Sequence, residues 1–189
     1  GTLTYGETPL GYDSWSFREP EGGGVVTLPF AILEGALYVG VVLQRRPNQG
    51  GEVWNAPRGY LESGEERSMA AEREFFEETG VAAGALIPLP GERANPNSAF
   101  FETWGEGEGV AFFAVEVAAT LLEPLDRRYR FRAGVVDGST EATKSRMAES
   151  IAQACFLDWR EAAGLADMFT NAAVARLVAY LAAGKREFR

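Results

Sequence analysis

The chain has 189 residues, of which 46% are hydrophobic, and this suits one domain with a substantial core. Its formal net charge of −9 argues against polyanionic nucleic acid as the main partner. The chain has no histidine, which excludes histidine triads, histidine-ligated zinc and histidine general bases. Acid–base chemistry therefore has to come from carboxylates, lysine, tyrosine or metal-bound water.

A single cysteine, Cys155, excludes an internal disulfide and suits a reducing compartment, so we expect a cytoplasmic protein. Because Cys155 lies in an apolar run, a small buried core residue is favoured over a catalytic thiol. No segment reaches the length of a membrane span, and the most apolar late run, residues 172–183, contains Arg176. The first six residues lack a basic region and an apolar core, so we expect no signal peptide and no membrane partner.

The chain divides into a short N-terminal extension, residues 1–24, and one domain over residues 25–189. The extension is rich in glycine, proline and glutamate, with a short strand near residues 15–18. Glu34-Gly35 is a hairpin turn between two apolar runs. Within the domain, apolar runs bounded by turn residues predict five strands, at residues 25–33, 36–43, 81–89, 110–117 and 151–157.

Three helices are also predicted. The first has a cap at Ser63 or Gly64 and runs to Thr79, with Gly80 as the left-handed stop. The other two lie near the C-terminus, at residues 158–168 and 171–183. This order of elements predicts an α+β fold, in which a mixed β-sheet packs between helices in an α/β/α sandwich.

A long connector, residues 118–148, separates two predicted strands, and its length is typical of a functional or mobile segment. Within it, residues 127–132 alternate basic and aromatic side chains, as a nucleic-acid-binding segment does. The same alternation with a period of two describes a half-buried strand, which we favour because the chain is acidic.

The first predicted helix has three carboxylates on one face. Glu74, Glu77 and Glu78 are spaced i, i+3 and i+4, so their side chains lie together. Stacked like charges repel, and a hard divalent cation with oxygen ligands would offset that cost. Arg73 precedes Glu77 by four residues and can brace it. The alternative is a solvated acidic face.

The remaining surface of this helix is largely apolar. Ala70 lies one turn before the carboxylates and leaves space beside them. The residues predicted to pack against the sheet are Met69, Ala71, Phe75 and Phe76.

Residues 59–81 resemble the Nudix box, the signature of hydrolases that cut a nucleoside diphosphate linked to another group X. The pattern is Gly, five residues, Glu, seven residues, Arg-Glu, an apolar residue, any residue, Glu-Glu, any residue, Gly and an apolar residue. Every fixed position is met, by Gly59, Glu65, Arg73, Glu74, Glu77, Glu78 and Gly80. The resemblance implies the same sandwich fold and metal-assisted hydrolysis of a diphosphate.

The resemblance assigns roles to the acidic residues of the box. Glu74 and Glu78 are implied as metal ligands, and Glu77 as a further ligand or a catalytic group that orients them. The carbonyl group of Arg58 is a candidate backbone ligand, and Arg73 orients the carboxylates. Mg²⁺ is the expected cofactor, with Mn²⁺ as the alternative.

A carboxylate from the long connector is expected as the general base or as a third metal ligand. Glu149 fits best, because it lies just before the last predicted strand, with only Ser150 between them. Glu141 is the alternative.

Beyond the box, over roughly residues 25–185, the chain is similar to the ADP-ribose pyrophosphatase branch of this superfamily. Gln44-Arg45-Arg46 is similar to its Gln-aromatic-Arg, and Trp54-Asn55-Ala-Pro-Arg-Gly to its Trp-Glu-Leu-Pro-x-Gly. Pro96 lies 16 residues after Gly80, the spacing typical of the branch. The resemblance therefore implies three substrate-binding residues, Gln44, Arg46 and Pro96. Two departures are Asn55 in place of Glu and Arg45 in place of the aromatic residue.

The implied substrate is a small nucleotide, either ADP-ribose or a nucleotide sugar, cleaved to a nucleoside monophosphate and a sugar phosphate. A homodimer is the assembly that the branch suggests. Two alternatives stay open: an enzyme of the same fold acting on a dinucleoside polyphosphate, NADH or RNA, and a non-catalytic nucleotide sensor.

Overall fold

The computed structural model describes residues 2–7, 13–18, 23–46, 51–93, 109–138, 144, 151–184, 186 and 188. In chain order, the strands are β1 (Thr2–Glu7), β2 (Asp13–Arg18), β3 (Gly23–Leu33), β4 (Ala36–Arg46), β5 (Gly51–Asn55), β6 (Arg58–Tyr60), β7 (Leu86–Pro88), β8 (Gly109–Glu116), β9 (Leu122–Leu125), β10 (Arg128–Phe131) and β11 (Ile151–Asp158). The helices are α1 (Arg67–Thr79), the 3₁₀ helix η2 (Ala119–Leu121), α3 (Trp159–Ala163) and α4 (Met168–Ala183).

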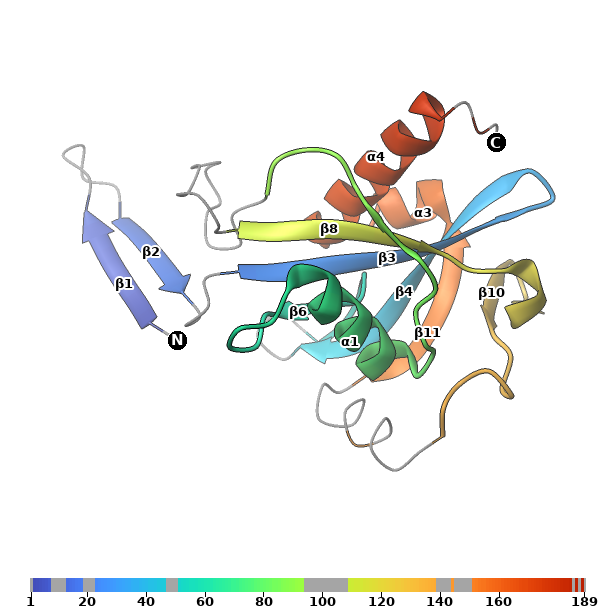
Figure 1. Ribbon diagram of the computed structural model, residues 1–189, viewed down its shortest axis with the longest axis horizontal. Helices are drawn as coiled ribbons and strands as arrows, with labels where there is room; N and C mark the ends of the chain where they lie inside the picture. Colours follow the sequence, from blue (N-terminus) through green and yellow to red (C-terminus); the bar gives the residue numbers. More distant parts are fainter. Residues whose placement is uncertain are drawn as a thin grey trace.

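Within the described residues, nine strands form one mixed sheet in the order β7-β8-β3-β4-β11-β10-β9. The short strands β5 and β6 pair with β4 and β3. The β3–β8 pair is parallel, and the other pairs of this sheet are antiparallel. β1 and β2 form a separate antiparallel pair (Figure 1). The predicted α+β sandwich with a mixed sheet is confirmed.

Helices cover both faces of this sheet (Figure 1). Because successive side chains of a strand point to opposite faces, β3 contributes to two different cores. Val26, Leu28 and Phe30 pack in a cluster that includes residues of α4. Ala31 and Leu33 pack in a second cluster with Phe75 of α1. The central strand therefore lies between α1 and α4, as the sequence pattern predicted.

The predicted N-terminal cap of the first helix is wrong. α1 begins at Arg67, and its N-cap residue, Glu66, makes no side-chain capping hydrogen bond within the described part of the chain. A turn precedes the helix, because the Glu65 N–H donates to the Glu62 carbonyl and the Glu62 N–H donates to the Glu65 carboxylate. The C-terminal prediction is confirmed, since Gly80 has φ 73° and its N–H donates to the Phe76 carbonyl.

The predicted apolar side of this helix is correct only in part. Ala71 and Phe75 are buried, and Phe76 is half-buried. Met69 is 60% exposed, so its predicted packing against the sheet is wrong. At 3.6 residues per turn, Met69 lies on the side of α1 opposite the buried residues Ala70, Ala71, Glu74, Phe75 and Glu78.

The predicted connector, residues 118–148, contains regular structure. β9 and β10 form a hairpin in which Arg128 pairs with Leu125, and Tyr129 pairs with Phe156 of β11. Phe131 is buried in the core and Tyr129 is half-buried. The strand interpretation of residues 127–132 is therefore confirmed, and the hairpin extends the sheet.

Three other predicted boundaries differ from the structure. Of the strand expected over residues 81–89, only β7 is extended. α3 has five residues rather than the expected helix over 158–168, and Gly164 is its C-cap. α4 begins at Met168, three residues before the expected start, because the Asp167 side chain caps it. Among the described residues, none of the helices is long and apolar enough to cross a membrane.

Candidate catalytic site

The carboxylates of α1 lie against the segment that leads into the helix. Glu78 is 1% exposed and Glu74 is 9% exposed, whereas Glu77 is half-buried. The Arg58 backbone N–H donates to Glu78 Oε2 over 3.2 Å. The structure therefore places the Arg58 backbone beside Glu78, on the same helix as Glu74 and Glu77. Burial of two carboxylates on one helix is costly unless they gain strong partners.

Gly59 is required by the position of Glu74. A Cβ atom at residue 59 would lie 2.0 Å from Glu74 Oε1, far inside contact distance. β6 also lies close to its partner strand β3, because a Cβ at Gly24 would lie 2.9 Å from the Gly59 carbonyl oxygen. The glycine of the motif thus allows β6 to pass directly over the Glu74 carboxylate.

Arg73 organises the acidic groups. Its Nη1 donates to Glu74 Oε1 over 2.7 Å and to Glu77 Oε2 over 3.2 Å. Nε and Nη2 both donate to the Glu65 carboxylate over 2.9 Å, and Nη2 also donates to the Tyr60 carbonyl. The expected bracing of Glu77 is confirmed, and Arg73 also forms hydrogen bonds with Glu74 and Glu65.

The interactions of this network shift the pKa values of Arg73 and Glu65. Hydrogen bonding to Glu65, opposed by burial, raises the pKa of Arg73. The same hydrogen bond lowers the pKa of Glu65 below its ordinary value. Both groups therefore stay charged at neutral pH, and the guanidinium is fixed as a cation between the carboxylates.

The donor chemistry fits a hard divalent cation. Glu74, Glu77 and Glu78 offer only oxygen atoms, and the close passage of Gly59 over Glu74 leaves a cradle that a Cβ would fill. In the described part of the chain, however, no three acidic or cysteine side chains converge in an arrangement that would hold a metal ion. Glu74 is instead paired with Arg73, and Glu78 accepts from Arg58.

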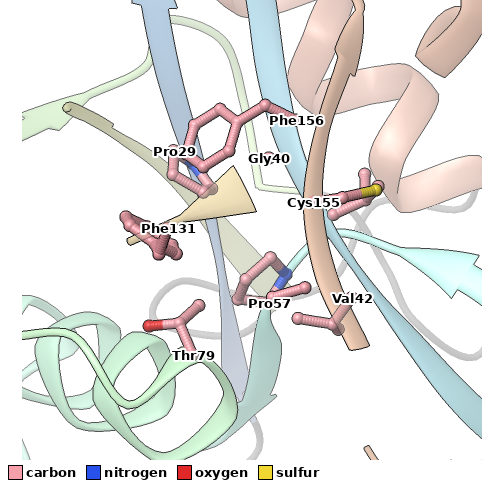
Figure 2. Close-up of a pocket in the computed structure, with 10 residues that line it drawn as sticks. Pro29, Gly40, Val42, Pro57, Thr79, Phe131, Cys155 and Phe156 are labelled. Carbon is pink, nitrogen blue, oxygen red and sulfur yellow. The ribbon is translucent and has the colours of Figure 1, made fainter. Parts of the chain in front are cut away.

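A pocket of about 210 Å³ opens beside Glu78. Strand β10, which the sequence analysis did not place at the site, forms part of its wall. Arg130 and Phe131 of β10 line it together with Thr79 at the end of α1. Sequence reasoning missed Arg130, although the alternation over residues 127–132 was a signal for its strand. A second, smaller pocket shares Thr79 and Phe131 and adds Pro57 (Figure 2).

The predicted substrate residues are described only in part. Gln44 is buried near the end of β4, opposite Val53 of β5. Arg46 ends β4, and its side chain lies outside the described residues, as do Pro96, Glu141 and Glu149. Their predicted roles stay predictions.

Asn55, one of the two departures from the branch pattern, and its neighbour Trp54 both have structural partners. Asn55 is fully buried, and its Nδ2 donates to the carbonyl groups of Val42 and Val53. Trp54 packs partly buried against the core, with the Arg128 guanidinium 5.8 Å from its ring centroid. Trp54 therefore belongs to the core packing beside β5. Cys155 is buried, which raises the pKa of its thiol to about 11, as expected for an inert core cysteine.

A family model described as the NUDIX domain matches residues 32–175. The match covers most of the chain, and the sheet, the helices on both faces and the acidic face of α1 agree with it. The chain therefore belongs to the NUDIX domain family, the family of the Nudix hydrolases.

Solved structures of other proteins show the same fold. A candidate NUDIX hydrolase from Listeria monocytogenes is 18% identical with a TM-score of 0.57, covering 88% of this chain and 97% of that one. A C. elegans Ap4A hydrolase is 16% identical with a TM-score of 0.52, covering 85% and 98%. The NUDIX domain of Shewanella oneidensis NrtR, complexed with ADP ribose, is 13% identical with a TM-score of 0.51, covering 89% of each chain. At these identities the similarity shows the fold alone.

Proposed function

We propose that this protein is a metal-dependent hydrolase that cleaves the diphosphate bond of a nucleoside diphosphate linked to another group. ADP-ribose or a nucleotide sugar is the proposed substrate, and a nucleoside monophosphate and a sugar phosphate are the products. The observation that carries the proposal is the pair of buried carboxylates, Glu74 and Glu78, held on one face of α1 beside the Arg58 amide.

Glu74, Glu78 and Glu77, with the carbonyl group of Arg58, are the groups that would hold Mg²⁺ or Mn²⁺. When bound, such a cation neutralises the negative charge of the phosphate oxygens, which otherwise shields phosphorus from attack. Arg73 keeps the carboxylates at one place through its hydrogen bonds to Glu74 and Glu77. This arrangement explains why the chain holds several like charges together instead of separating them.

Glu149 is proposed to take a proton from the attacking water, with Glu141 as the alternative. The Glu149→Gln variant should then lower kcat with little change in KM, because a general base acts in the transition state and not in substrate binding. Steady-state kinetics of both variants distinguish the two residues. Unchanged kinetics for Glu149→Gln together with a loss in Glu141→Gln would transfer the role to Glu141.

The choice of substrate rests on the branch resemblance. Gln44, Arg46 and Pro96 are the proposed substrate-binding residues. The proteins of similar fold named above include an Ap4A hydrolase and a domain complexed with ADP ribose, so both classes of compound are included in one test. The homodimer stays a prediction.

A product screen tests the proposal. The protein is incubated with Mg²⁺ and, separately, with ADP-ribose, NADH, sugar nucleotides, dinucleoside polyphosphates and nucleoside triphosphates, and the products are separated by chromatography. We expect ADP-ribose or a sugar nucleotide to have the highest kcat/KM. If dinucleoside polyphosphates or nucleoside triphosphates rank first, the proposed substrate class is wrong, although the proposed hydrolase activity stands. If no compound is hydrolysed but one binds, the protein is a nucleotide sensor.

A further inference from the structure

We propose that Asp167 is a positioning residue that fixes the Arg58 amide against Glu78. Asp167 is the N-cap of α4, on the face of the sheet opposite α1, and it acts through the Arg58 side chain. The catalytic consequence rests on the proposed function, whereas the tether itself does not.

The two carboxylate oxygens of Asp167 have different partners. Oδ1 accepts from Arg58 Nη1 over 2.6 Å. Oδ2 accepts from the N–H of Thr170 over 2.8 Å and from its hydroxyl over 2.7 Å, which caps α4. The side chains of Arg58 and Asp167 are only 12% and 8% exposed. A charge-assisted hydrogen bond that is shielded from water in this way is stronger and more rigid than a surface pair.

The N-terminal end of α4 also contacts the segment of residues 56–58 at a second point. The Thr170 hydroxyl, fully buried, accepts from the Ala56 N–H over 2.7 Å. Between the two tethered residues, the Pro57 carbonyl accepts from the Thr27 N–H of β3 over 2.9 Å. Residues 56–58 are thus fixed on both sides of a proline, and α4 supplies two of these three contacts.

Glu78 accepts a hydrogen bond from the segment formed by residues 56–58. Arg58 donates its backbone N–H to Glu78 on α1 and its guanidinium to Asp167 on α4, so one residue connects the two helices. In this proposal, loss of the contact with Asp167 loosens the Arg58 backbone, both its amide and the carbonyl group proposed as a metal ligand. Groups that orient metal ligands in this indirect way commonly affect metal affinity or activity by about 10- to 100-fold.

The competing explanation for the Arg58–Asp167 pair is that these side chains contact the substrate directly. Arg58 and Asp167 line a pocket of about 400 Å³ together with Val53, Met168 and Phe169. The Arg58 guanidinium lies 5.1 Å from the Phe169 ring centroid, which holds it against the wall. A residue that contacts substrate there would change KM, whereas a positioning residue changes kcat and the protection of the Arg58 amide.

The Asp167→Ser variant separates the tether from the cap. Serine is about as good an N-cap as aspartate, so α4 is retained, but its shorter side chain loses the second oxygen that binds Arg58. Hydrogen exchange of backbone amides, followed by NMR, should show about 10-fold or more faster exchange of the Arg58 amide. The Leu89 amide, bonded to the Phe112 carbonyl, is the internal reference and should not change.

Two further variants complete the experiment. Arg58→Met breaks the tether from the other side and leaves the cap of α4 intact, so it serves if Asp167→Ser fails to fold. Adding Asp167→Ser to Arg58→Met should have no further effect on kcat, because both act through one contact. Glu116→Gln is the control, because it removes the charge that pairs with Arg186 at the surface, and it should leave the Arg58 amide unchanged.

With the best substrate of the screen, Asp167→Ser should lower kcat about 10-fold or more and leave KM nearly unchanged. Wild-type exchange of the Arg58 amide in this variant would overturn the tether, whether or not the protein hydrolyses any compound. Faster exchange with unchanged kcat would overturn the role in catalysis. A raised KM with unchanged kcat would assign Asp167 to substrate contact instead.

Discussion

Helices α1 and α4 pack on opposite faces of one sheet, but they bury different kinds of side chain. Two of the six buried residues of α1 are glutamates, Glu74 and Glu78. α4 buries four apolar residues and one threonine, which is bonded to its cap. α4 begins at a side-chain cap, whereas α1 has none within the described residues.

This contrast indicates that α4 contributes mainly to stability and α1 mainly to the catalytic site. Buried carboxylates destabilise a fold unless they are paired, and here Glu74 accepts from Arg73 and Glu78 from the Arg58 N–H. Apolar packing of α4 on the sheet is a favourable term without such a cost. The molecule therefore depends on α4 for stability and can keep acidic groups in α1 for the site. The four variants below test this division.

Leu177→Ala should have the largest effect on stability. Leu177 is fully buried in α4, and the lost packing and the cavity should lower the free energy of unfolding by about 2–5 kcal/mol. Turnover per folded molecule should stay normal, because Leu177 lies in the core and not at the site. Denaturant unfolding measures the difference. Met69→Ala, at an exposed position of α1, should change stability by less than about 0.5 kcal/mol. Equal losses in both variants would contradict the division.

Glu78→Gln should show the opposite behaviour. The change keeps the shape of the side chain and an oxygen for the Arg58 N–H but removes a charge, so kcat should fall about 100-fold or more. The unfolding transition should stay cooperative. Glu72→Gln, at an exposed position of the same helix, is the control and should keep normal turnover. Near-normal turnover of Glu78→Gln at saturating Mg²⁺ would remove Glu78 from the site.

Gly59→Ala tests the contact between β6 and α1. The new methyl group would overlap Glu74 Oε1, so the carboxylate has to move away from Arg73, and kcat should fall about 10-fold or more. Gly134→Ala is the control, since no described atom lies within 4 Å of its Cβ position. Steady-state kinetics compare the two. Equal activity in both variants would show that the position of Glu74 does not matter.

The Glu65–Arg73 pair should give the smallest effect. The pKa of Glu65 is lowered from its ordinary value of 4.5, so its stabilising contribution is complete above that pH and is lost as the pH falls through the folded-state pKa. Glu65→Gln should therefore be less stable than the wild type at pH 7, by no more than about 1 kcal/mol, and the difference should shrink toward pH 3. Thermal unfolding at several pH values measures it. A difference that grows in acid would have the wrong sign.

Local spacing predicted the parts of the fold that depend on neighbours in the chain. The i, i+3, i+4 carboxylates, the stop at Gly80 and the hairpin at Glu34-Gly35 all follow from residues within a few positions of one another. The helix start at Ser63 or Gly64 failed because a turn from Glu62 to Glu65 uses the polar groups that would have formed the cap. Local propensity is weak enough for such a contact to override it.

The sequence by itself therefore determined the family, the acidic helix and the mixed sheet between helices. Tertiary structure alone decided which groups hold that helix in place. Arg58 meets Asp167 across 109 positions of sequence, and Ala56 meets Thr170 across 114. The β10 hairpin reaches the pocket beside Glu78 only because the sheet brings it there. Such contacts join segments that are distant in the chain, and no period or spacing along one segment encodes its partner in another.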